Sequence, residues 1–288
     1  MRQDVPSARA DHSVNIGPLA LPAALLALLF GIIAGMAAVG FLTKRGHADA
    51  GNALYFVLGV GLLFARVGYV VRWWPQYMQQ PSSILNIRDG GFDIVTGLVT
   101  LLLAATLIGW KRAVLRSPLA VGVFVGVATW AFGSLVVYRL VDAVHPALPA
   151  VVLQDLDGRD VALGTMSGKP TVINLWATWC GPCRREMPVL VQAQRKMPSV
   201  RFVFADQGES ATVVRQFLQT QGLAPLHVLL DGNMQLTQHY SVRGYPTTLF
   251  LDDRGHLRDT HIGELSAATL AEHVARIEQG PLRPAAVH

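Results

Sequence analysis

Cysteine and charged residues are both scarce in this sequence. The 288 residues include only two cysteines, Cys180 and Cys183, which excludes a four-cysteine zinc site and a structural disulfide beside a separate thiol pair. No histidine has helical metal-ligand spacing with a second strong ligand, so we expect no metal site. Only 15% of the residues are charged and 51% are hydrophobic, which is too apolar for an ordinary soluble protein. The net charge of +5 does not come from one long basic run, so we expect no nucleic-acid-binding surface.

The apolar residues gather between residue 18 and about residue 140, in stretches long enough to cross a bilayer. Glycine is frequent in all of them, as in helices that approach one another closely in lipid. The first stretch is too long for a signal peptide, and its nearest basic residues follow it, so we expect it to remain as an anchor. The expected membrane domain covers residues 1–141, with spans at about 18–42, 53–71, 92–110 and 118–138.

Basic residues in the short loops indicate the orientation of these spans. Lys44 and Arg45 follow the first span, and Lys111, Arg112 and Arg116 follow the third. Loops rich in lysine and arginine stay in the cytoplasm, so we expect both termini on the opposite side. The middle loop also carries arginines, which weakens this contrast.

Residues 65–97 read ARVGYVVRWWPQYMQQPSSILNIRDGGFDIVTG and resemble the early part of the prolipoprotein diacylglyceryl transferases. That family has a histidine shortly after the paired glycines, where this chain has Val95, and its later arginine- and asparagine-containing signature has no counterpart here. We therefore expect a truncated relative without lipid transfer, which could keep a lipid- or partner-binding groove. Arg66 lies inside the second span, and it is either a functional charge or a side chain that reaches the membrane interface.

The second half of the chain alternates short apolar strands with amphipathic helices. We expect a linker at 142–149, an α/β domain at 150–280 and a tail at 281–288. Alternation of this kind predicts a largely parallel sheet covered on both faces, and a final hairpin and helix make the sheet mixed. The expected fold is therefore an all-α domain of four transmembrane helices followed by an α/β domain with a central mixed sheet.

The two cysteines follow a predicted buried strand at 171–177 and begin a helix, which favours a redox pair over half of a metal site or a chance spacing. A helix N-terminus presents free N–H groups and a partial positive charge, which favour a thiolate. We expect Cys180 to be the nucleophile and Cys183, about one turn further on, to resolve the mixed disulfide. Pro182 suits the first turn, where its missing N–H costs nothing.

The string NLWATWCGPCRREMP and the later GYPTT resemble the thioredoxin superfamily, most of all its membrane-tethered TlpA/ResA type, over nearly all of the second half. The resemblance implies a cis-proline at Pro246 beside the cysteines and a backbone contact from Tyr245 to the substrate peptide. The alternative is an ordinary proline at the first residue of a strand. Trp179, Gly181 and Pro182 complete the substrate-binding surface that the resemblance implies.

Glu186 follows Cys183 by one helical turn. The resemblance implies a carboxyl group near the active site that holds or passes the proton of Cys183. The alternative is a first-turn glutamate that complements the helix dipole. Thioredoxin has a buried aspartate six residues before its first cysteine, and this chain has Asn174 there, so the acid–base role falls to Glu186.

The resemblance implies a multi-pass protein of a bacterial inner membrane, with the thioredoxin-like domain in the periplasm. Its activity would be reduction of thiol proteins, including apocytochromes c, through a redox disulfide Cys180–Cys183 and without a cofactor. Because the membrane half contains no cysteine, electrons must come from another protein, by resemblance a transporter of the DsbD/CcdA type. Two alternatives stay open: a dithiol oxidase or isomerase on the same fold, and a lipid- or partner-binding assembly module in which the membrane half is primary.

Overall fold

The structure, a computed structural model, describes residues 13–16, 19–79, 81–141, 147–166 and 168–278, and these residues form two units that we treat separately. One unit, the helical unit, contains His12–Ile84 and Gly90–Ala143. The other, the thioredoxin-like unit, contains Val144–His288 together with Leu85–Asp89. The first part of the expected linker, residues 142–146, and the expected tail, residues 281–288, lie outside the described residues.

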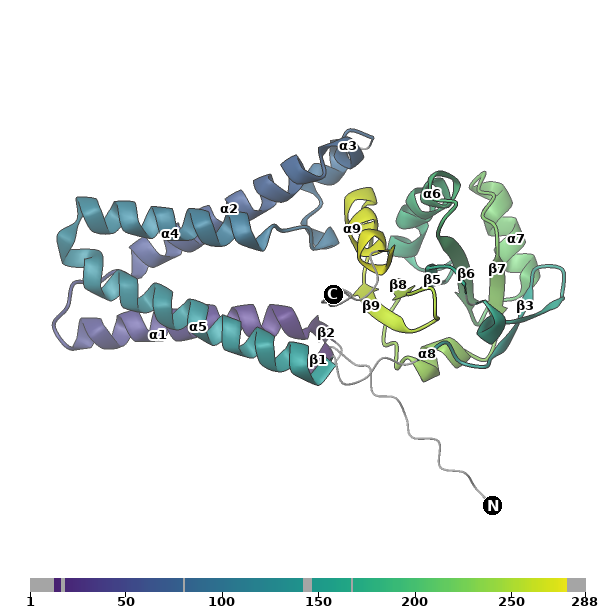
Figure 1. Ribbon diagram of the computed structural model, residues 1–288, viewed down its shortest axis with the longest axis horizontal. Helices are drawn as coiled ribbons and strands as arrows, with labels where there is room; N and C mark the ends of the chain where they lie inside the picture. Colours follow the sequence, from purple (N-terminus) through teal and green to yellow (C-terminus); the bar gives the residue numbers. More distant parts are fainter. Residues whose placement is uncertain (1–12, 17–18, 80, 142–146, 167, 279–288) are drawn as a thin grey trace, which may run out of the picture. The chain divides into compact units, whose positions relative to one another are not determined.

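Four long helices make up most of the helical unit (Figure 1), and each is long and apolar enough to cross a membrane. Asp93 is the N-cap residue of the third long helix, α4 (Ile94–Lys111), and its carboxylate accepts a 2.7 Å hydrogen bond from the backbone N–H of Thr96. The elements are β1 (Ser13–Ile16), β2 (Leu19–Pro22), α1 (Ala23–Lys44), α2 (Gly51–Arg72), the short α3 (Trp74–Tyr77), α4 (Ile94–Lys111) and α5 (Arg116–Val141).

Small residues let α1 and α5 lie side by side (Figure 1). A Cβ atom added to Gly35 would lie 2.7 Å from the carbonyl oxygen of Gly122, and one added to Gly31 would lie 2.7 Å from that of Gly126. Gly31 and Gly35 on α1 are four residues apart, as are Gly122 and Gly126 on α5, and this spacing places both glycines of a helix on one face. The glycines that are frequent in the sequence therefore form a close backbone contact of the kind that stabilises helix pairs in lipid.

Arg66 is enclosed by the chain that connects α3 to α4. Its guanidinium group donates hydrogen bonds to the carbonyl oxygens of Gly91 at 2.7 Å, of Ile84 at 3.0 Å and of Ser83 at 3.3 Å. The residue is only 9% exposed, and its guanidinium carbon lies 5.4 Å from the centre of the Tyr77 ring. The charge is therefore stabilised by backbone carbonyls and an aromatic face, and it fixes the path of this connection.

The thioredoxin-like unit is built on a seven-stranded mixed sheet in the order β4-β3-β7-β6-β5-β8-β9. Its central strands β5, β6 and β7 are parallel and its other pairs are antiparallel, which confirms the expected α/β fold with a mixed sheet. The strands are β3 (Val152–Asp155), β4 (Asp160–Ala162), β5 (Thr171–Trp176), β6 (Arg201–Gln207), β7 (Val228–Asp231), β8 (Thr247–Leu251) and β9 (Leu257–Ile262). The helices are α6 (Gly181–Lys196), α7 (Ala211–Thr220), α8 (Gln235–His239) and α9 (Ala267–Glu278).

Every residue of β5 is buried, so each of its two faces meets a separate hydrophobic cluster. Successive side chains of a strand point to opposite faces, and Val172 and Trp176 therefore join α6, α7 and α9, while Ile173 and Leu175 join α8. Before β3, Ala147 forms a bridge with His256, so the described end of the expected linker already pairs with this unit. Coverage on both sides holds the carboxyl end of β5 in place, and the two cysteines follow that end.

Candidate active site

Cys180 and Cys183 form a disulfide at the start of α6. Cys180 is the N-cap residue of the helix, and its Sγ atom accepts a 3.2 Å hydrogen bond from the backbone N–H of Cys183. Cys180 is 4% exposed and Cys183 is fully buried, so an incoming disulfide reaches Cys180 first. The same helix N–H groups would stabilise a Cys180 thiolate once the pair is reduced. Gly181 and Pro182 occupy the first turn of the helix between the cysteines.

The loop before β8 approaches the cysteines from the neighbouring strand. The peptide bond between Tyr245 and Pro246 is cis, and Pro246 is buried. Because Thr247 pairs with Leu175 near the end of β5, this bond lies at the same edge of the sheet as the cysteines. The ring of Tyr245 lies 6.1 Å, centre to centre, from the ring of Trp179, which is 68% exposed. An aromatic pair, with Trp179 exposed and Tyr245 half-buried, therefore lies next to Cys180.

Glu186 is 1% exposed and accepts two hydrogen bonds. One oxygen accepts from the side-chain amide of Asn174 at 2.8 Å, and the other accepts from the backbone N–H of Leu265 at 2.9 Å. Burial raises the pKa of Glu186 to about 8, the two hydrogen bonds oppose that rise, and the nearby charge of Glu264 adds to it. Asn174 also donates to the hydroxyl of Thr248 at 3.0 Å. A carboxyl group with such a pKa can release or accept a proton near neutral pH.

A pair of carboxyl groups, those of Glu209 and Asp206, holds the segment before the cysteines, and the sequence analysis did not identify it. Glu209 accepts hydrogen bonds from both the backbone N–H and the hydroxyl of Thr178, each at 2.6 Å. Asp206 in turn accepts from the backbone N–H of Glu209 at 3.0 Å. Burial and the neighbouring Glu209 raise the pKa of Asp206 to about 8. The signal in the sequence was Asp206, directly after the apolar, strand-like run at 200–205. Functional groups gather at the carboxyl ends of parallel strands.

The structure brings Cys180, Cys183, Glu186, Trp179 and the Tyr245–Pro246 loop to one edge of the sheet, and Arg66 belongs to the other unit. Within the described parts of the chain, no group of three His, Cys, Asp or Glu side chains is arranged to hold a metal ion. The Cys180–Cys183 pair provides for thiol–disulfide exchange. A dithiol at a helix N-terminus with a carboxyl group one turn away defines a thiol–disulfide oxidoreductase.

Comparison with known proteins identifies both halves of the chain. Residues 143–276 match the Redoxin family, and residues 12–150 match the prolipoprotein diacylglyceryl transferase family. The thioredoxin-like protein YneN of Bacillus subtilis is 35% identical over 122 residues, which are 41% of this chain and 71% of YneN. The thiol-disulfide oxidoreductase ResA of Bacillus thuringiensis is 30% identical over 131 residues, which are 45% of this chain and 75% of ResA.

A solved structure, StoA of Bacillus subtilis, is similar over 44% of this chain and 98% of its own, with 28% identity and a TM-score of 0.39. On the sequence relationships, the chain belongs to the thioredoxin-like thiol–disulfide oxidoreductases that include ResA. The match of residues 12–150 confirms that this domain follows a region related to the diacylglyceryl transferases, as the sequence indicated.

Proposed function

We propose that the protein is tethered to a bacterial inner membrane and reduces disulfides of extracytoplasmic proteins. The Cys180 thiolate attacks one sulfur of the client disulfide, which forms a mixed disulfide and releases the first client thiolate. Cys183 then attacks the Cys180 sulfur, which closes the Cys180–Cys183 disulfide and releases the second client thiolate. Two electrons pass to the client, and its thiolates take up the two protons that the enzyme thiols lose. The observation that carries this proposal is the buried Cys183 directly behind Cys180 at the helix N-terminus.

Glu186 is the proposed proton acceptor for Cys183, one helical turn away on α6. A carboxyl group with a pKa of about 8 matches the pKa of a thiol, so a proton moves between them with little free-energy cost. The proposed role of the Tyr245–Pro246 loop is to present backbone to the client peptide, with Trp179, Gly181 and Pro182 lining the opposite side.

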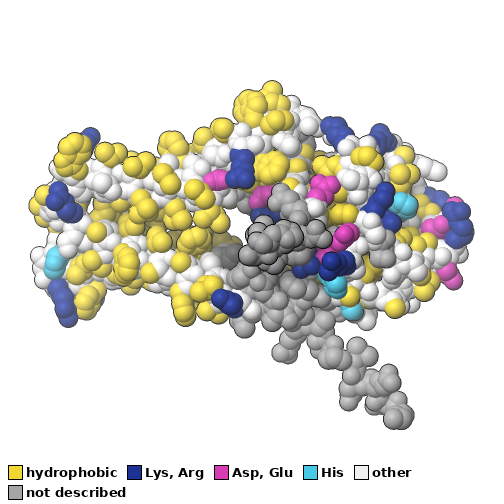
Figure 2. All heavy atoms as spheres, in the orientation of Figure 1, with side chains coloured by type: hydrophobic (Ala, Val, Ile, Leu, Met, Phe, Trp, Pro, Cys, Tyr) yellow, Lys and Arg dark blue, Asp and Glu magenta, His cyan; other side chains and the backbone are white. Residues whose placement is uncertain are grey.

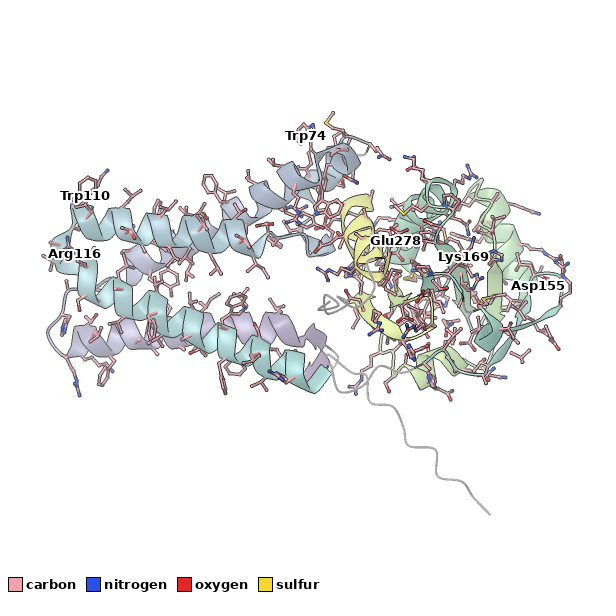
Figure 3. All side chains as sticks on the ribbon, viewed as in Figure 1. Trp74, Trp110, Arg116, Asp155, Lys169 and Glu278 are labelled. Carbon is pink, nitrogen blue, oxygen red and sulfur yellow. A yellow bond between two sulfur atoms is a disulfide. The ribbon has the colours of Figure 1, made fainter. Side chains whose placement is uncertain are left out.

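Membrane tethering is supported by the surface of the helical unit. Hydrophobic side chains cover much of the visible face of α1, α2, α4 and α5 (Figure 2). The exposed side chains of these helices include Phe30, Phe56 and Phe124. Trp74 and Trp110 lie at opposite ends of this unit (Figure 3), as expected for the aromatic belts of a membrane protein. We place the α1–α2 and α4–α5 loops, with their basic residues, in the cytoplasm, and therefore the thioredoxin-like unit in the periplasm.

The source of electrons is a second protein. Residues 1–179 contain no cysteine, so the chain cannot pass electrons across the bilayer by its own dithiol exchange. We propose a donor of the DsbD/CcdA type and clients that include apocytochromes c. The helical unit then serves as an anchor, since Val95 stands where the transferase family has its histidine.

A redox titration of the Cys180–Cys183 pair tests the direction of transfer. We expect a reduction potential near that of thioredoxin, about −270 mV, which would favour donation of electrons to clients. A potential near that of DsbA, about −120 mV, would instead assign the protein as a dithiol oxidase. Labelling with a membrane-impermeant thiol reagent after reduction tests the location, because only an outward-facing Cys180 would react in intact cells.

A further inference from the structure

Three side chains form a hydrogen-bonded chain that ends at the aromatic pair beside Cys180. The hydroxyl of Thr237 donates to the side-chain oxygen of Gln207 at 2.7 Å. The same hydroxyl lies 2.8 Å from the hydroxyl of Tyr245. A threonine hydroxyl has one hydrogen, and Thr237 uses it on Gln207, so Tyr245 must donate to Thr237.

Gln207 anchors this chain in the sheet. It is 3% exposed at the end of β6, and its amide nitrogen donates to the carbonyl oxygen of Ala205 at 3.2 Å. Because the nitrogen is used in this way, the side-chain oxygen is left to accept from Thr237. The hydrogen bonds therefore connect Gln207 on β6, through Thr237 on α8, to the side chain of Tyr245.

The consequence is a fixed ring orientation. Tyr245 meets Trp179 edge to face, with ring centres 6.1 Å apart and planes inclined at 64°. The proposed thiol exchange uses none of these three polar side-chain groups, because its electrons pass between sulfur atoms and its protons pass between thiols and Glu186. The hydrogen-bonded chain acts instead on the surface that a client peptide meets when it approaches Cys180.

We propose that Gln207 and Thr237 are positioning residues for client selection. They hold the Tyr245 ring so that Tyr245 and Trp179 together contact an aromatic or large aliphatic side chain next to the attacked cysteine of the client. The substrate class is therefore an oxidised peptide segment with an apolar residue beside its cysteine. This inference rests on the proposed exchange at Cys180 and adds a preference among clients to it.

The test compares two disulfide-containing peptides that differ only in the residue before the attacked cysteine, phenylalanine or serine. The reduced full-length protein in detergent is mixed with an excess of each peptide, and the second-order rate constant of the single turnover is measured. An aromatic contact of this kind corresponds to a preference of about 2- to 13-fold for phenylalanine. We expect Thr237→Val and Tyr245→Phe to bring the ratio close to one, and Thr237→Ser to keep it, while the reduction potential of the cysteine pair stays unchanged in all three.

A wild-type ratio of one would overturn the inference, as would a ratio that survives both Thr237→Val and Tyr245→Phe. A uniform loss of rate with both peptides would also overturn it, because that result indicates only a structural role. If the protein oxidises peptides instead of reducing them, the same ratio is measured with the dithiol forms. Failure of the proposed reductase direction is in this way separate from failure of the selection mechanism.

Discussion

The side-chain amide of Asn174 donates a 2.8 Å hydrogen bond to the carboxyl group of Glu186. Asn174 lies on β5 and Glu186 on α6, so this bond joins the strand before the cysteines to the helix after them. In thioredoxin the strand position carries the buried acid. Here β5 carries the amide of Asn174 instead, and the buried carboxyl group is that of Glu186 on α6.

Replacement of Glu186 by glutamine should remove the contribution of Glu186 to the pH dependence of the resolving step and leave the contribution of the Cys183 thiol. In the wild-type protein Glu186 loses its proton as the pH rises through about 8, so its action as a base increases over that range. We expect Glu186→Gln to resolve the mixed disulfide roughly a hundredfold more slowly at pH 8, the lower end of typical acid–base contributions. Stopped-flow measurement of the resolving step from pH 6 to 9 checks this, with the exposed Glu278→Gln as control. An unchanged pH profile in Glu186→Gln would exclude the proton role.

Glu186 should also make the thioredoxin-like unit less stable as the pH rises. Its pKa is raised from 4.5 to about 8 in the folded protein, so the folded state binds the proton more tightly than the unfolded state. The stability that this provides is complete below pH 4.5 and is lost progressively up to about pH 8, with a slope of about 1.4 kcal/mol per pH unit at most. Asp206 acts in the same direction.

Hydrogen exchange of the β5 amides in the full-length protein, corrected for the intrinsic exchange rate, measures this effect. We expect the free energy of opening to fall more steeply with pH in the wild type than in Glu186→Gln. If the stability of the wild type relative to Glu186→Gln increased from pH 5 to pH 8, that result would contradict the assignment.

The glycine contact between α1 and α5 should be sensitive to bulk at Gly35. A leucine there would place its Cβ 2.7 Å from the Gly122 carbonyl oxygen, so the helices must separate. Gly40 lies on the same helix with nothing within 4 Å of an added Cβ, which makes Gly40→Leu the matched control. We expect Gly35→Leu to lower the melting temperature in detergent by several degrees and Gly40→Leu to change it little. Equal effects of the two substitutions would rule out this contact as a source of stability.

Loss of Arg66 should release the connection between α3 and α4. Arg66→Leu leaves the carbonyl oxygens of Gly91 and Ile84 without this donor, at a cost of about 1–3 kcal/mol for the buried Gly91 carbonyl and less for the half-buried Ile84 carbonyl. Arg72→Leu is the control, since Arg72 is largely exposed and its ion pair with Asp93 is long, at 3.5 Å. We expect protease cleavage within residues 79–93 to become faster in Arg66→Leu alone. Equal cleavage rates of the two variants would contradict the proposed structural role of Arg66.

Features set by neighbouring residues could be read from the sequence, and features set by tertiary register could not. The buried run at 171–177 predicted a strand, and β5 covers Thr171–Trp176. The hydrogen bonds from Thr178 to Glu209 join residues 31 positions apart and depend on the parallel pairing of β5 with β6. No local pattern records that pairing.

The same reason applies to the chain from Gln207 through Thr237 to Tyr245. It depends on how α8 packs against the end of β6, and nothing in the sequence distinguishes Gln207 and Thr237 from other polar residues. Arg66 could be predicted from the sequence in part. Its place inside an apolar stretch identified it as special, but only the path of the backbone at Gly91 and Ile84 explains what stabilises its charge.

Trapping of clients in membranes tests the central claim most directly. In the Cys183→Ala variant the mixed disulfide on Cys180 cannot be resolved, so we expect client proteins to stay attached to the full-length chain and to be released by dithiothreitol. The double variant Cys180→Ser/Cys183→Ala should trap none. Adducts that form equally without Cys180, or a Cys180→Ser single variant that keeps full turnover with an oxidised client, would contradict the mechanism.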